Sequence, residues 1–139
     1  MSDTLLEDPF ATVPGGAEAA RGGRASMKFV SCMIRPESLD AVTAALSQIE
    51  VVGGMTVTDV RGFGRQKGQV EHYRGGEYTI RFLSKVKVEV AVHAEHVDDV
   101  VTAISRAART GQVGDGKIVV LEMRNALRIR TGEKGTSAL

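Results

Sequence analysis

The sequence predicts an α+β fold of the ferredoxin-like class, in which strands and helices follow the order strand, helix, strand, strand, helix, strand. Four short runs rich in β-branched residues predict the strands, at residues 28–34, 55–60, 85–92 and 117–123. Apolar residues recur at helical spacing in two intervals, one after the first run and one before the last. At 139 residues with 42% hydrophobic content, the chain has room for one such domain.

The first helix is expected directly after the first strand, because Pro36 suits the first turn of a helix, where its missing N–H is not needed. Its apolar stripe comprises Leu39, Val42, Leu46 and Ile49, and Gly53 and Gly54 follow it. The second helix has acidic residues early and basic residues late, as the helix dipole favours. Its stripe comprises Val97, Val100, Val101, Ile104 and Ala108, and Gly111 ends it.

Residues outside this pattern divide the chain into an extension and a domain. Residues 1–26 are rich in Ala, Gly and charged side chains without sustained periodicity, which predicts a disordered N-terminal extension. Residues 27–139 form the predicted domain, with a flexible C-terminal tail from about residue 131 to 139. The start of the ordered pattern at Met27 leaves open whether translation begins there.

Charge and composition exclude several classes of protein. A net charge of +1 and an aromatic content of 4% without Trp argue against a nucleic-acid-binding protein, which would need a basic surface or stacking platforms. A single cysteine, Cys32, allows no internal disulfide, and no apolar run has the length of a membrane span or the layout of a secretory signal. We therefore expect a cytoplasmic protein that does not insert into membranes.

The interval between the second and third strands is the first candidate for function. It spans about 20 residues, and unstructured connections beyond about 15 residues are generally functional or disordered. It opens with RGFGRQKG, residues 61–68, in which glycines free the backbone to approach a ligand and polar side chains supply donors. The pattern indicates an anion cradle, although a solvated hairpin tip has the same composition.

A second glycine cluster, TGQVGDGK at residues 110–117, has the spacing of a phosphate-binding P-loop. Ile118 occupies the position of the magnesium-binding hydroxyl, and the loop precedes a strand rather than a helix, so we reject a P-loop hydrolase. Backbone amides and Lys117 can still bind phosphate. Arg128 and Arg130 are two apart, so an extended segment would direct both guanidinium groups to one side, where three cations could converge on one polyphosphate. Two exposed arginines remain the alternative.

Five motifs in register, MTVTDVRGFGRQKG, EHYRGGEY, KVKVEV, TGQVGDGKI and RIRTGE, resemble the PII nitrogen-regulatory proteins over Met27 to Glu133. The resemblance implies a homotrimer that binds ATP or ADP between subunits, with a long T-loop at about residues 64–80. It implies these nucleotide-binding residues: Thr56, Gly62, Arg65, Gly114, Gly116, Lys117, Arg128 and Arg130.

The resemblance also implies an effector site for 2-oxoglutarate formed by Gln66, Lys67 and Lys85, with Gln66 joining the ATP phosphates around Mg²⁺. Tyr78 matches a tyrosine that is uridylylated in many members. Glu37 and Ser38 depart from the aromatic residue and lysine that are usual there, which points to altered partners more than to altered ligands.

The expected function is therefore that of a sensor rather than an enzyme. ATP with 2-oxoglutarate, or ADP, would set the state of the T-loop, which regulates an ammonium transporter or other regulators and enzymes of nitrogen assimilation. One alternative is a related protein that senses adenine nucleotide with another small anion such as bicarbonate. Another is a small nucleotide or phosphate hydrolase using Arg65 and Lys117, but no convincing nucleophile or general base accompanies these cations.

Overall fold

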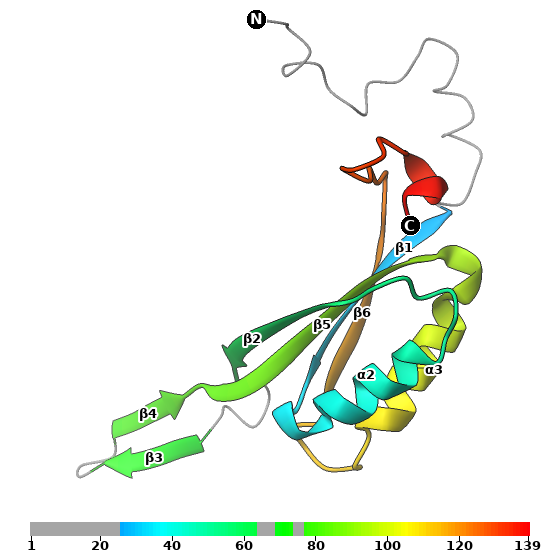
Figure 1. The fold of residues 1–139 in the computed structure, drawn as a ribbon. Helices are drawn as coiled ribbons and strands as arrows, with labels where there is room; N and C mark the ends of the chain where they lie inside the picture. Colours follow the sequence, from blue (N-terminus) through cyan, green and yellow to red (C-terminus); the bar gives the residue numbers. More distant parts are fainter. Residues whose placement is uncertain (1–25, 64–68, 74–76) are drawn as a thin grey trace, which may run out of the picture.

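A four-stranded antiparallel sheet forms the centre of the computed structural model, which describes residues 26–63, 69–73 and 77–139. The strands are β1 (Met27–Ile34), β2 (Thr56–Gly62), β5 (Leu83–His93) and β6 (Gly116–Glu122), in the order β2-β5-β1-β6 (Figure 1). β1 is central, because it pairs with β5 on one side and β6 on the other. The order and antiparallel pairing agree with the expected ferredoxin-like arrangement.

Two antiparallel helices, α2 (Leu39–Ser47) and α3 (Val97–Ala108), lie on the same face of the sheet (Figure 1). A single 3₁₀ turn precedes each of them, η2 (Pro36–Ser38) before α2 and η3 (Ala94–His96) before α3. Pro36 starts η2, as its fixed φ and missing N–H favour. α3 has the expected bounds, whereas α2 ends two residues before Ile49, the last residue of the expected stripe.

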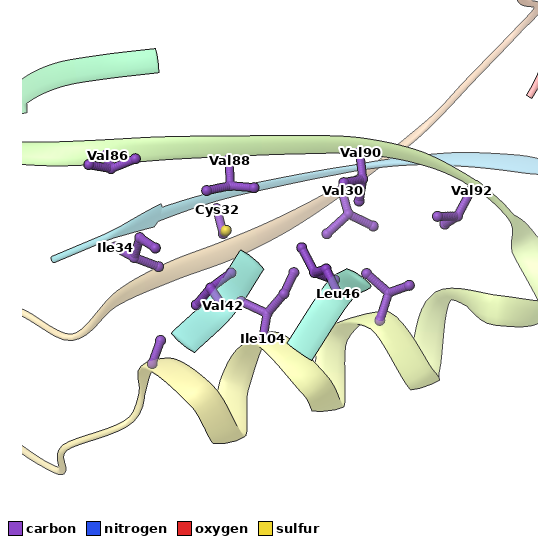
Figure 2. Close-up of a cluster of buried hydrophobic side chains, with 12 residues drawn as sticks. Val30, Cys32, Ile34, Val42, Leu46, Val86, Val88, Val90, Val92 and Ile104 are labelled. Carbon is purple, nitrogen blue, oxygen red and sulfur yellow. The ribbon is translucent and has the colours of Figure 1, made fainter. Parts of the chain in front are cut away.

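The hydrophobic core lies between the helices and this face of the sheet (Figure 2). In β5 the valines at alternating positions all face the helices, because side chains of a strand alternate between its two faces. α2 contributes Val42 and Leu46, and α3 contributes Val100 and Ile104. Cys32 is fully buried among them, as expected for a small apolar residue, and this burial raises the pKa of its thiol.

The opposite face of the sheet is open, since no helix or strand in the described part of the chain lies over it (Figure 1). Lys117, Met33 and Lys87 form one row across this face, because each lies opposite the next in the strand register. Three large apolar residues on it remain exposed, Met33 by 40%, Val119 by 43% and Leu121 by 52%. The face is thus partly apolar and uncovered in a single chain.

The long interval between β2 and β5 contains regular structure of its own. β3 (Gln69–Tyr73) and β4 (Glu77–Arg81) pair as a two-stranded hairpin that projects beyond the end of the sheet (Figure 1). The sequence did not predict these strands, because each is only 5 residues long and lies among polar residues and glycines, so the short alternation in EYTIR is a weak signal. Near the C-terminus, Leu127 and Lys134 form an isolated β-bridge, and η4 (Gly135–Ala138) follows it. The flexibility predicted for residues 131–139 stays a prediction.

We expect Leu46→Ala to lower the free energy of unfolding by about 2–5 kcal/mol, because it removes buried methyl groups and leaves a cavity. Leu46 has no exposed surface and packs in the core cluster. Denaturant-induced unfolding followed by circular dichroism would measure the change. Val51→Ala is the control, since Val51 is 43% exposed and should change stability by much less. Equal losses from both variants would contradict this description of the core.

Candidate functional site

One end of the sheet gathers several of the predicted binding residues. Ile34, the last residue of β1, lies opposite Val86 of β5 on one side and Gly116 of β6 on the other. The loop from α3 to β6, residues 109–115, therefore meets the end of β1 and the first half of β5. Lys85, Gly114 and Gly116 thus come together, although they are distant in sequence.

Two cationic side chains hold consecutive carbonyl groups of this loop. The ammonium of Lys85 donates to the Gly114 carbonyl at 2.7 Å. The guanidinium of Arg35, directly after β1, donates to the Val113 carbonyl at 2.6 Å. A residue predicted for the effector site is therefore bonded to a residue predicted for the nucleotide site.

Asp115 organises the same loop from within. Its carboxylate accepts hydrogen bonds from the backbone N–H groups of Thr110 and Gly111, each at 2.8 Å, and from the Thr110 hydroxyl. It also pairs with Nε of Arg35 at 3.4 Å. The hydrogen bond from the Thr110 hydroxyl, followed by those from the backbone and Arg35, lowers the pKa of Asp115 to about 2. The carboxylate is therefore charged at neutral pH.

Gly114 and Gly116 have positive φ angles of 103° and 109°, which L-residues with side chains rarely adopt. A Cβ on Gly116 would lie 1.7 Å from the carbonyl oxygen of Met33, so β6 can approach β1 here only with glycine. A Cβ on Gly114 would lie 3.1 Å from the Arg35 guanidinium. Both glycines, predicted as phosphate-binding residues, thus have steric roles in the fold.

A cavity of about 470 Å³ lies beside Lys85 at the same end of the sheet. Its lining combines an acidic, a basic and a hydroxyl side chain with apolar groups, from Pro36, Asp59, Val60, Arg61, Ser84 and Lys85. In other proteins, cavities of this volume bind small ligands. The strands β2 and β5 and the turn η2 supply these residues, so the cavity adjoins Lys85 and Pro36, the residue that follows Arg35.

The segment that follows β6 and carries Arg128 and Arg130 starts at the end of the sheet opposite to Lys117 within one chain. Lys117 is opposite Met33 near the end of β1, whereas both arginines follow the end of β6, which is opposite Lys28. The expectation of an extended segment was wrong: residues 129–131 form a turn, closed by the hydrogen bond from Gly132 N–H to the Arg128 carbonyl. Side chains two residues apart point to the same side only in an extended backbone, and the turn removes this alternation.

The Arg128 side chain is engaged in the C-terminal segment. It donates to the Glu133 carboxylate and to the carbonyl of Leu139, each at 3.0 Å. Arg130 is exposed. The three cations predicted to converge on one polyphosphate are therefore not brought together by a single chain.

The remaining predicted residues are spread over β2 and the interval between β2 and β5. Thr56 begins β2 and Gly62 ends it, opposite Glu89 and Leu83 of β5, respectively. Tyr78 lies in β4, opposite His72. The predictions for Arg65, Gln66 and Lys67 fall outside the described residues.

Sequence reasoning missed Arg35 and Asp115 as parts of this site. Asp115 was visible only as the acidic residue within a glycine-rich motif, and Arg35 only as the residue before Pro36. Their contact joins positions 80 residues apart, which no local pattern reports.

The family model described as "Nitrogen regulatory protein P-II" matches residues 27–133, well over half of the chain. The chain belongs to the P-II family. It is 57% identical over 113 residues to a nitrogen regulatory protein P-II of Nostoc punctiforme, covering 81% of this chain and 100% of that protein. It is 51% identical, with the same coverage, to the nitrogen regulatory protein GlnK of Escherichia coli K12.

A solved structure supports the same assignment. The P-II chain resembles Arabidopsis thaliana PII bound to citrate, with a TM-score of 0.68, 37% identity and coverage of 83% of this chain and 94% of that one. Because its relatives are regulatory proteins, the prediction of a signalling protein rather than an enzyme is confirmed. In the described ranges, no helix is both long and apolar enough to cross a membrane.

We expect Gly116→Ala to destabilise this P-II chain strongly, because the new methyl group would clash with the Met33 carbonyl at a φ that alanine rarely adopts. Thermal unfolding followed by circular dichroism would measure the loss. Gly53→Ala is the matched control, since no atom lies within 4 Å of a Cβ at that position. A Gly116→Ala protein with native stability would contradict the steric role of this glycine.

Proposed function

We propose that this P-II protein senses ATP and ADP together with 2-oxoglutarate, and reports them to nitrogen-metabolism targets through the T-loop. The observation that carries the proposal is the hydrogen bond from Lys85 to Gly114, which joins the predicted effector lysine to the predicted phosphate loop. A ligand at one residue therefore acts on the surroundings of the other. Such coupling is what a sensor of two ligands needs.

The proposed assembly is a homotrimer with nucleotide bound between subunits. Two features of the single chain support an assembly. Its open sheet face exposes Met33, Val119 and Leu121, and exposed apolar patches commonly mark interfaces. The separation of Arg128 and Arg130 from Lys117 is the second feature, because a neighbouring chain is needed to bring both groups to one nucleotide.

The proposed nucleotide site combines Thr56, Gly62 and Arg65 with Gly114, Gly116 and Lys117, and with Arg128 and Arg130 across the subunit boundary. Glycines with positive φ and nearby cations suit phosphate oxygens, because backbone N–H groups and positive charges both bind anions. The turn around Arg128 would present these arginines at the subunit boundary, in place of the extended arrangement.

In the proposed effector site, Lys85 pairs with a carboxylate of 2-oxoglutarate, while Gln66 and Lys67 complete the site. The Arabidopsis PII relative is bound to citrate, another small carboxylate, in its crystal structure. Within the described ranges no group of three His, Cys, Asp or Glu residues could hold a metal ion. Mg²⁺ would therefore depend on ATP phosphates, the effector and Gln66, which fits a requirement for ATP rather than ADP.

The T-loop, residues about 64–80, is the segment proposed to contact target proteins. Its β3–β4 hairpin projects beyond the end of the sheet (Figure 1). Lys85 and the residues that line the cavity lie near the start of β5 and the end of β2. A conformational preference set by ligands at its base would change the surface that it offers to a target. The proposed targets are an ammonium transporter or regulators and enzymes of nitrogen assimilation, and Tyr78 is the proposed modification site.

We expect 2-oxoglutarate to bind the purified protein in the presence of Mg²⁺ and ATP, and not with ADP, as measured by calorimetric titration. Gln66→Ala should abolish binding under ATP, because it removes the proposed magnesium ligand. Gln48→Ala is the control, since Gln48 is exposed at the end of α2.

Two other outcomes of this titration would change the proposal. Binding that is independent of ATP or of Gln66 would contradict the proposed effector site. If nucleotide binds and 2-oxoglutarate does not, the alternative with bicarbonate and AMP or ADP takes its place, and bicarbonate titrated with each nucleotide would test it.

We expect the native protein to sediment with about three times the chain mass of 14.8 kDa in analytical ultracentrifugation. Leu121→Asp should shift it to smaller species, because it places a charge on the open sheet face. Val51→Asp, at an exposed residue after α2, is the control and should leave the mass unchanged. A monomeric native protein would contradict the trimer.

A further inference from the structure

We infer that Arg35 is a positioning residue that, with Lys85, fixes the orientation of the 113–115 peptide groups that the loop offers to phosphate. The inference rests on the proposed nucleotide binding at this loop and assigns a role to a residue that would not itself contact phosphate. We call Arg35 and Lys85 together the carbonyl clamp.

Arg35 contacts three consecutive residues of the loop. It donates to the Val113 carbonyl at 2.6 Å, pairs through Nε with the Asp115 carboxylate at 3.4 Å, and packs against Gly114. Gly114 suits this contact, because residues with a side chain rarely adopt its φ of 103° and a Cβ there would lie only 3.1 Å from the guanidinium. Lys85 adds the bond to the Gly114 carbonyl, so two successive carbonyl groups are held by cations.

The clamp determines where the amide groups point. In a planar trans peptide the N–H is directed opposite to the C=O, and the described residues contain no cis peptide bond. Holding the Val113 and Gly114 carbonyls toward Arg35 and Lys85 therefore turns the N–H groups of Gly114 and Asp115 away from these side chains. Successive N–H groups presented in a turn form an anion-binding nest.

Charge balance distinguishes the roles of the two cations. Arg35 and Asp115 are each only about a quarter exposed, at 24% and 22% of their side chains, and neutralise one another. Arg35 therefore acts through the loop. Lys85 forms no ion pair with an acidic side chain of the described residues, so it stays available to an incoming carboxylate. A carboxylate at Lys85 would draw the ammonium from the Gly114 carbonyl or share it, and so alter the loop.

The test is calorimetric titration of ADP into the full-length native protein, Arg35→Met, Arg35→Lys and Arg106→Met. We expect Arg35→Met to weaken ADP binding about tenfold, and Arg35→Lys to recover part of the loss because it keeps a charged donor for the Val113 carbonyl. Arg106→Met is the matched control, because Arg106 is an exposed arginine of α3, on the helix side of the sheet and away from the open face. It should bind ADP like the native protein.

Amide hydrogen exchange of residues 110–117 without ligand provides a second measurement. Arg35→Met should exchange faster in this segment and at the native rate in β1 and β5, and its melting temperature should stay near the native value. Native ADP affinity and native exchange in Arg35→Met would overturn the clamp alone. Absence of ADP binding by the native protein would instead overturn the proposed nucleotide function, and with it the phosphate role of the clamp.

Discussion

The alternation of β5 is the constraint on which the rest of the structure depends. Val86, Val88, Val90 and Val92 must all face the helices, since only that face is covered. A shift of one residue in register would expose every one of them. The same alternation directs Lys85, Lys87 and Glu89 to the open face, so the burial that stabilises the domain also places its polar side chains where ligands or other chains can reach them.

The position of the loop before β6 depends on the pairing between β1 and β6. Antiparallel pairing brings Gly116 against Met33 so closely that no side chain fits, and this fixes the loop at the end of β1. Arg35, next along the chain after β1, can then reach back to Val113 and Asp115. Asp115 is held charged by the donors around it, so the ion pair persists at neutral pH. The order of this loop comes from contacts between distant segments rather than from its own sequence.

A single chain leaves the predicted nucleotide site divided. Lys117 and the two C-terminal arginines lie at opposite ends of β6, and the uncovered sheet face carries apolar side chains. The proposed homotrimer would explain both features: burial of the open face would supply free energy of association, and the subunit boundary would join the two halves of the proposed site. Membership of the P-II family places the chain among regulatory proteins.

The sequence by itself determined the order of the core strands and helices, the valine stripe of β5 and the family, because periodicity and motif spacing are local or collinear properties. It indicated Lys85 and the glycine loop through the resemblance. Only the tertiary structure decided that Arg35 reaches Asp115 across 80 positions, that Gly116 faces a carbonyl, and that residues 129–131 turn and leave Arg128 far from Lys117. These depend on strand register and chain path, which arise from contacts between residues that are distant in sequence.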